Sequence, residues 1–270
     1  MIVARFFVPV LVFGMLLCVP AYAATRPIVL IPLDDRPVTL QLPLLLGRIA
    51  GRSVVAPPVS LLGTYLRFGE PDAIIAWLNS RAPRNARAYV ISSDMLAYGG
   101  LVASRVPGTT FADAYFRLRE LQRLRASRPQ AWIGTFGTIM RLAPTGVPAA
   151  GDAASFFAAY PTWTYLQQYA NLHDPPVGEE VARAAQLAAQ IGQPALDAYL
   201  QARERNYAVD HLLVDALSHR TIDRLVLGQD DAGTVGLHVR EVRALEAYLA
   251  QSGASERGSI EPGADELGMA

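Results

Sequence analysis

The sequence contains no lysine, and all 24 of its basic residues are arginine. Schiff-base enzymes need a lysine amine as the reacting group, and P-loop nucleotide-binding proteins and protein kinases need a lysine at the phosphate-binding position. These three classes are therefore excluded. Because 24 acidic residues balance the arginines, the formal net charge is +0 and the usual electrostatic signature of a nucleic-acid-binding protein is also missing.

Cysteine is almost absent as well, since Cys18 is the only one. It lies in an apolar run, residues 6–19, which follows Arg5 and leads into Ala21-Tyr22-Ala23, the small-x-small pattern of a signal-peptidase site. We predict a signal peptide over residues 1–23 and an exported chain, periplasmic or extracellular. The alternatives are an uncleaved anchor, although about 14 apolar residues are fewer than the roughly 20 of a spanning helix, and lipidation of Cys18, although Leu17 before it is not small.

Cleavage after Ala23 would remove the cysteine together with the long apolar run. The remaining chain could then form neither a disulfide nor a thiolate metal site, and it would have no stable membrane span. Its stability would have to come from a hydrophobic core, for which a single α/β domain over residues 24–270 is long enough.

Short apolar runs rich in β-branched residues recur along the chain, and each one ends in a polar or Gly/Pro-containing turn. Continuous rather than alternating apolarity indicates strands that are buried on both faces of a parallel sheet. We predict six strands, at residues 28–31, 53–56, 88–91, 131–134, 224–227 and 258–260. The third of the turns is expected at residues 92–94 and the fourth at residues 135–138.

Helical periodicity fills the intervals, for example over residues 111–124 and 239–249. Strands that alternate with helices indicate right-handed βαβ units. The interval between Arg141 and Thr221 has no strand candidate, so we predict a helical insertion at about residues 145–220.

Acidic side chains follow most of the predicted strands. In parallel α/β folds the carboxyl ends of the strands carry the functional site. A barrel brings every strand end to one rim, whereas a doubly wound sheet uses mainly the ends beside its switch point. The distribution of acids therefore favours a TIM-barrel-like (β/α)8 fold, with a Rossmann-like doubly wound three-layer α/β/α sheet as the alternative.

Carboxylates gathered at one edge of a sheet can divide into a general acid and a base or nucleophile, as in glycoside hydrolysis. They can also hold a divalent cation, or each can merely cap a helix. The candidate catalytic residues are Asp94, Asp230 and Asp231. The candidate substrate-binding residues are Asp34, Asp35, Arg36, Tyr98, Gly99, Gly100, Arg105, Arg141, Gln229, Asp265 and Glu266.

Several other patterns are weaker indications of a functional site. The segment Gly233-Thr234-Val235-Gly236 is not a dinucleotide-binding fingerprint, so we expect no nucleotide partner. His211, Asp215 and His219 share one helical stripe, which is more typical of a polar helix face than of a metal site, and we predict no dedicated metal ligands. Arg203 and Arg205 either reach the site or lie on a solvated helix face.

Six motifs, in this order, resemble those of the bacterial family DUF4127, from about residue 27 to residue 266. They are Pro32-Leu33-Asp34-Asp35-Arg36-Pro37-Val38, the stretch from Ser93 to Arg105, Ile139-Met140-Arg141, Arg203-Glu204-Arg205-Asn206, Gln229-Asp230-Asp231-Ala232 and Pro262-Gly263-Ala264-Asp265-Glu266. The chain departs from the family at Asp210, where members usually have asparagine.

The resemblance implies two further strand units beyond residue 270, eight in all, which suits a barrel and makes the chain an expected C-terminally truncated member. The family name implies no activity. From the residues we expect a hydrolase that acts on carbohydrate or a cell-envelope glycan through its strand-end carboxylates. The alternatives are a divalent-metal-dependent phosphate or ester hydrolase and a non-catalytic envelope or glycan-binding protein.

Overall fold

The computed structural model describes residues 26–64, 67–145, 162–230, 233–265 and 267. The predicted signal peptide, Asp231 and Glu266 lie outside the described residues. Among the described helices, none combines the length and the apolarity that crossing a bilayer requires.

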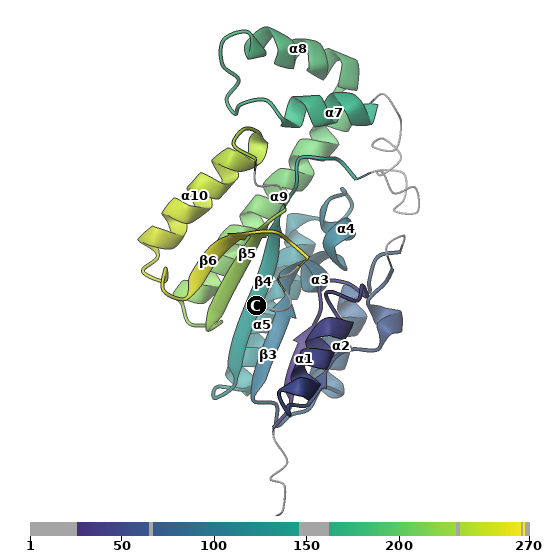
Figure 1. Cartoon of the computed structure of the whole chain (residues 1–270), viewed down its shortest axis with the longest axis vertical. Coiled ribbons are helices and arrows are strands. Elements are labelled where there is room, and N and C mark those ends of the chain that lie inside the picture. The colour runs from purple at the N-terminus through teal and green to yellow at the C-terminus, as the bar shows by residue number, and fades with distance from the viewer. Residues whose placement is uncertain (1–25, 65–66, 146–161, 231–232, 266, 268–270) are drawn as a thin grey trace, which may run out of the picture.

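Six parallel strands form one sheet, which confirms the predicted parallel α/β fold (Figure 1). The strands are β1 (Ile28–Ile31), β2 (Val54–Val55), β3 (Ala88–Ser92), β4 (Trp132–Ile139), β5 (Arg224–Gln229) and β6 (Gly258–Pro262). Their order across the sheet is β2-β1-β3-β4-β5-β6. A barrel of consecutive units would pair the strands in chain order, whereas here β1 lies between β2 and β3, so the described sheet follows the doubly wound alternative.

The central strand β4 is longer than its sequence pattern indicates. The turn that we predicted at residues 135–138 is wrong, because the strand continues through it to Ile139. Gly137 and Thr138 pair with Leu227 and Gly228 of β5, and the space above Gly137 is filled by the Ser93 hydroxyl, which would lie 2.3 Å from an added Cβ. The polar and glycine residues are thus required by packing and do not mark a chain reversal.

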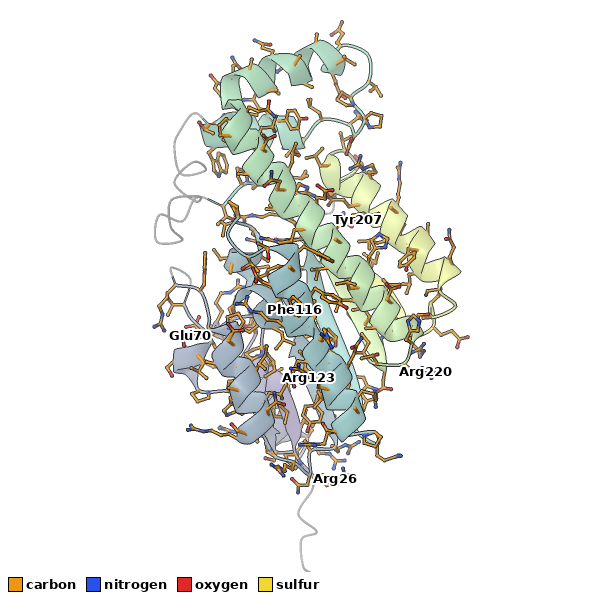
Figure 2. The ribbon with its side chains drawn as sticks, turned by 180° about the vertical axis from the view of Figure 1, so that it is seen from behind. Arg26, Glu70, Phe116, Arg123, Tyr207 and Arg220 are labelled. Atoms are coloured by element: carbon orange, nitrogen blue, oxygen red, sulfur yellow. The ribbon has the colours of Figure 1, made fainter. Side chains whose placement is uncertain are left out.

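Four helices cover one face of the sheet: α2 (Pro71–Ser80), α5 (Phe111–Ser127), α9 (Gln193–Ser218) and α10 (Leu237–Gln251) (Figure 2). Their apolar faces meet the strands in the main core, where Ile74, Leu121, Leu213 and Leu245 are buried. The helix α1 (Gln41–Ile49) lies on the opposite face, beside β2 (Figure 1). Right-handed crossovers produce this division, because the chain moves outward from β1 to β2 and then returns past β1 to β3.

A second, smaller core lies beyond the carboxyl ends of the strands. It joins the first half of α9 to α7 (Thr162–Ala170) and α8 (Glu180–Ile191) through buried side chains that include Leu166, Leu187 and Tyr199. With 26 residues, α9 is about 39 Å long and spans both cores. The boundaries of the predicted helical insertion stay a prediction.

The remaining elements are short and belong to the loops above the sheet. They are the 3₁₀ turn η1 (Val59–Leu61), α3 (Ser93–Tyr98) and α4 (Leu101–Ser104). The loops after β1 and β3 flank the switch point, where α/β sheets of this order form their ligand-binding crevice.

Candidate functional site

A cleft of about 190 Å³ opens at the carboxyl ends of the strands. Loops after all six strands contribute to its walls. Of the predicted site residues it is lined by Asp34, Asp35, Arg36, Gly99, Gly100, Arg105, Arg141, Asp230 and Asp265. The strand-end rule, that the carboxyl ends of parallel strands carry the site, therefore correctly predicted that these nine residues from distant parts of the sequence lie together.

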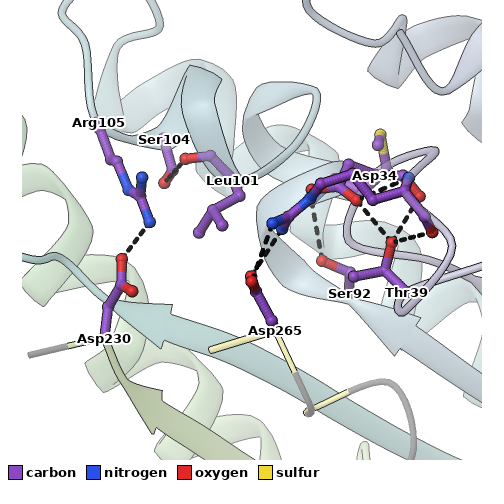
Figure 3. Close-up of polar contacts among 10 residues, drawn as sticks. Asp34, Thr39, Ser92, Leu101, Ser104, Arg105, Asp230 and Asp265 are labelled. Carbon is purple, nitrogen blue, oxygen red and sulfur yellow. Dashed lines mark hydrogen bonds and ion pairs between the residues drawn. The ribbon is translucent and has the colours of Figure 1, made fainter. Parts of the chain in front are cut away.

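Arg36 connects the first strand loop with the last one. Its two terminal nitrogens donate to the carboxylate oxygens of Asp265 at 3.0 and 2.8 Å, and its Nε donates to Asp34 Oδ2 at 2.8 Å. The Thr39 hydroxyl donates to the other oxygen of Asp34 at 2.6 Å. A bidentate contact of this kind fixes the orientation of both groups, so one side of the cleft is a preformed network (Figure 3).

A second ion pair, Arg105 with Asp230, lies on the other side of the cleft (Figure 3). The Arg105 side chain is buried, whereas that of Asp230 is 20% exposed and faces the cleft. Burial lowers the pKa of Arg105, and the neighbouring charges of Arg141 and Arg36 lower it further, against the opposing effect of Asp230. Arg36, Arg105 and Arg141 thus lie near enough for their positive charges to repel one another.

Asp94 lies in the first turn of α3, behind the cleft wall. The Ser92 hydroxyl accepts from the amide of Met95 and caps this helix. Burial raises the pKa of Asp94 to about 7, because Thr138 and Arg105 offset only part of the desolvation, while Asp230 raises the pKa further. The Oδ2 atom of Asp94 has no hydrogen-bond partner among the described residues.

Gly99 and Gly100 bring the backbone of the third loop against its neighbour. Gly99 has a φ of +96°, which L side chains rarely adopt, and an added Cβ would lie 2.6 Å from the carbonyl oxygen of Gly69. The carbonyl of Gly99 accepts from the amide of Gly69 at 2.8 Å. The glycine pair therefore serves a close approach of two backbone segments at the cleft wall.

The family model described as "Protein of unknown function (DUF4127)" matches residues 28–270, which is nearly the whole chain. The chain belongs to this family. No curated protein and no solved structure matches it. The site of this DUF4127 chain therefore has to be interpreted from its own geometry.

Tyr98 and Gln229 do not line the cleft of this DUF4127 chain. Tyr98 is buried, with the guanidinium of Arg205 4.6 Å from its ring centroid. Gln229 is the last residue of β5, and its backbone carbonyl accepts from the amide of Gly263. A role for Tyr98 in stacking on a sugar ring would need this packing to open.

The two arginines of the family motif on α9 are buried and stay outside the cleft. Arg203 forms an ion pair with Glu241 of α10, while Arg205 donates to the backbone carbonyls of Ser104 and Val106. From the sequence we expected these arginines either to reach the site or to lie on a solvated helix face, and both alternatives are wrong. Both side chains instead hold loops and helices together behind the site. The DUF4127 motif is thus partly structural here.

Sequence reasoning missed two polar residues near the site. Arg67 lines the cleft from the loop after β2, whose one acid, Glu70, stands at the start of α2 and not at the strand end, so the loop gave no signal. Asp210 is buried on α9, where burial and then the charge of Asp94 raise its pKa. Its position at helical spacing from Arg203 and Asn206 could have revealed a buried polar stripe.

The chain's acids and histidines do not converge on a metal centre within the described residues, where no group of three or more could hold an ion. Asp34, Asp230 and Asp265 each bind an arginine instead. On α9, the ring of His211 packs between Tyr207 and Tyr248, and Asp215 accepts from the hydroxyl of Tyr248.

Proposed function

We propose that this DUF4127 protein is a hydrolase that acts on carbohydrate or a cell-envelope glycan through carboxyl groups at its strand ends. The observation that supports the proposal is the cluster of Asp94, Arg105 and Asp230. It places a buried carboxyl group with a pKa of about 7 next to an ion-paired carboxylate that faces the cleft.

Glycoside hydrolysis needs two carboxyl groups in different protonation states, one to protonate the leaving oxygen and one to act as base or nucleophile. Burial favours the protonated form of Asp94, whereas Arg105 lies directly against the Asp230 carboxylate. Asp94 is therefore the candidate acid and Asp230 the candidate base or nucleophile.

Asp94 must reach the glycosidic oxygen for this role, directly or through one water. It does not line the cleft, but it is close enough to Asp230 and Arg105 for their charges to affect its pKa. Catalytic hydrogen bonds often tighten only when the substrate binds. The unpartnered Oδ2 atom is the part of Asp94 that is free to make such a contact.

Arg141 and Arg67 provide contacts for the polar groups of a glycan. Arg141 donates to the Ala143 carbonyl at 3.1 Å and to the Thr145 hydroxyl at 3.4 Å, and Arg67 donates to the Ser60 carbonyl. Neither forms an ion pair with a carboxylate among the described residues. The remaining N–H donors of these guanidinium groups can bind hydroxyl, carboxylate or phosphate groups on a sugar.

The test compares Asp94→Asn and Asp230→Asn with the parent on a panel of glycans that includes cell-wall fragments. We expect each substitution to lower kcat/KM by at least about 100-fold, which is the scale of general acid-base catalysis. The control is Asp197→Asn on α9, whose carboxylate accepts a hydrogen bond from Gln193 and does not line the cleft, and it should retain parental activity. Equal activity in Asp230→Asn and the parent would refute the assignment.

The same panel separates the other two functions. Activity that disappears with a chelator and returns with a divalent cation would indicate the metal-dependent phosphate or ester hydrolase. Binding of a glycan without turnover by the parent protein would indicate a binding protein.

A further inference from the structure

We propose that the edge of the sheet opposite the cleft docks on a membrane surface rich in anionic phospholipids. At this edge every strand begins at, or within four residues after, an arginine. These arginines are Arg26, Arg52, Arg87, Arg128, Arg224 and Arg257.

The loops that precede the strands are strongly basic, although the chain as a whole has no net charge. They contain eight arginines and only two carboxylates, in residues 26–27, 51–53, 81–87, 128–131, 219–223 and 252–257. The two carboxylates are Asp223 and Glu256, and Asp223 is already bound by Arg125. Figure 2 shows Arg26 at the end of the molecule opposite α7 and α8, and Arg220 just beyond the C-terminal end of α9.

The arginines of this edge are unpaired, in contrast to those of the cleft. None of the six forms an ion pair within the described part of the chain. Arg26 and Arg224 donate to backbone carbonyls, whereas Arg36 and Arg105 at the other edge bind carboxylates.

Helix dipoles do not account for the whole pattern. Arginine near a helix C-terminus is stabilising, which explains Arg128 after α5 and Arg220 after α9. Arg52 and Arg87 stand within two residues of the start of β2 and β3 and make no side-chain hydrogen bond among the described residues. Their exposed side chains therefore stabilise no other part of the described structure.

Arg26, Arg52 and Arg87 surround a shallow hollow of about 470 Å³ together with Gln130 and Trp132. The Trp132 side chain is 45% exposed. Tryptophan with arginine is the combination found where proteins meet lipid headgroups, because the indole is amphipathic and the guanidinium binds phosphate. A hollow of this composition accepts a phospholipid headgroup.

The extent of the basic edge favours a flat surface over a small soluble anion. Six strands at about 4.8 Å spacing spread the arginines over roughly 24 Å. Ile49, the last residue of α1, adds an apolar side chain that is 75% exposed.

The experiment measures binding of the full chain to vesicles of phosphatidylcholine with and without 30% phosphatidylglycerol. The double variant Arg52→Gln, Arg87→Gln is compared with Arg119→Gln, Arg243→Gln, which removes two exposed charges from α5 and α10. We expect the first variant to bind anionic vesicles about 30-fold more weakly than the parent and the second less than about threefold, because each edge arginine contributes electrostatically.

Any contribution of the apolar run is read from the neutral vesicles, because it does not depend on lipid charge. The difference between anionic and neutral vesicles should disappear at high salt. Equal binding of both double variants, or binding of a soluble polyanion such as heparin without any preference for anionic vesicles, would overturn the proposal.

Discussion

Asp94 shows how strongly one side chain depends on its surroundings. An aspartate in the first turn of a helix would ordinarily be a solvated cap, but here desolvation raises its pKa to about 7. The sequence indicates that Asp94 follows a strand. Its burial could not be foreseen, because the groups around it, among them Thr138 of β4 and Asp210 of α9, come from later parts of the sequence.

The raised pKa of Asp94 makes the stability of the protein depend on pH. A carboxyl group with a folded-state pKa above its unfolded value of 3.8 stabilises the fold fully below that value, and this contribution is lost as the pH rises through about 7. We expect Asp94→Asn to flatten the decline of unfolding free energy between about pH 4 and pH 7, by up to about 4 kcal/mol.

Urea unfolding at several pH values measures this effect, with Asp197→Asn as the control. The parent and the control should lose stability together as the pH rises. A parallel decline in Asp94→Asn would show that another buried acid, for which Asp210 is the first candidate, is responsible.

At the scale of elements, a buried ion pair joins α9 to α10. Arg203 donates to Glu241 through Nε at 2.9 Å and also to the carbonyl of Arg141 at 2.8 Å. Burial raises the pKa of Glu241 and the arginine opposes that effect. The pair therefore has to be kept together once both groups are buried.

We expect Arg203→Ala to destabilise the protein by roughly 3–5 kcal/mol, because it leaves the Glu241 carboxyl group buried without its partner. Arg240 is on α10, as Glu241 is, and its exposed side chain forms an ion pair with Asp174. Arg240→Ala should change stability by less than about 1 kcal/mol. Thermal unfolding of the two variants measures the difference. Similar melting temperatures would mean that the Glu241 carboxyl group is neutral in the fold.

The elements differ in how well sequence predicts them. β1 has the predicted bounds because its apolar run ends at proline. β4 does not, because Gly137 and Thr138 look like a turn until a neighbour is known to fill the space above Gly137. The order of the strands depends on crossover directions that no local pattern records.

At the scale of the whole molecule, the strand-end rule found Asp34, Asp230 and Asp265, because parallel strands deliver their ends to one edge. Arg67 and Asp210 were missed for opposite reasons. The first comes from a loop without a local motif, and the second lies on a buried polar stripe of α9 that only its helical spacing from Arg203 and Asn206 could have revealed.

The contact between Arg36 and Asp265 joins positions 229 residues apart. We expect Asp265→Asn to increase hydrogen exchange in residues 34–40 and 258–265, because it removes the charge that holds the two loops together. The Asp265 side chain is 47% exposed, so global stability should fall by less than about 1 kcal/mol. Exchange that rises evenly across the sheet would contradict a local role, and Asp72→Asn, the exposed partner of Arg117, is the control.

The positions of the tryptophans give the protein a built-in optical reporter. Trp77 is buried in the main core, Trp132 is 45% exposed at the basic edge, and Trp163 is 37% exposed in α7 beyond the cleft. Indole fluorescence shifts to the blue when its surroundings lose water, and a different exposed indole lies at each end of the molecule. Replacing Trp132 or Trp163 by phenylalanine in turn would therefore reveal, from the emission spectrum alone, which end a given ligand occupies.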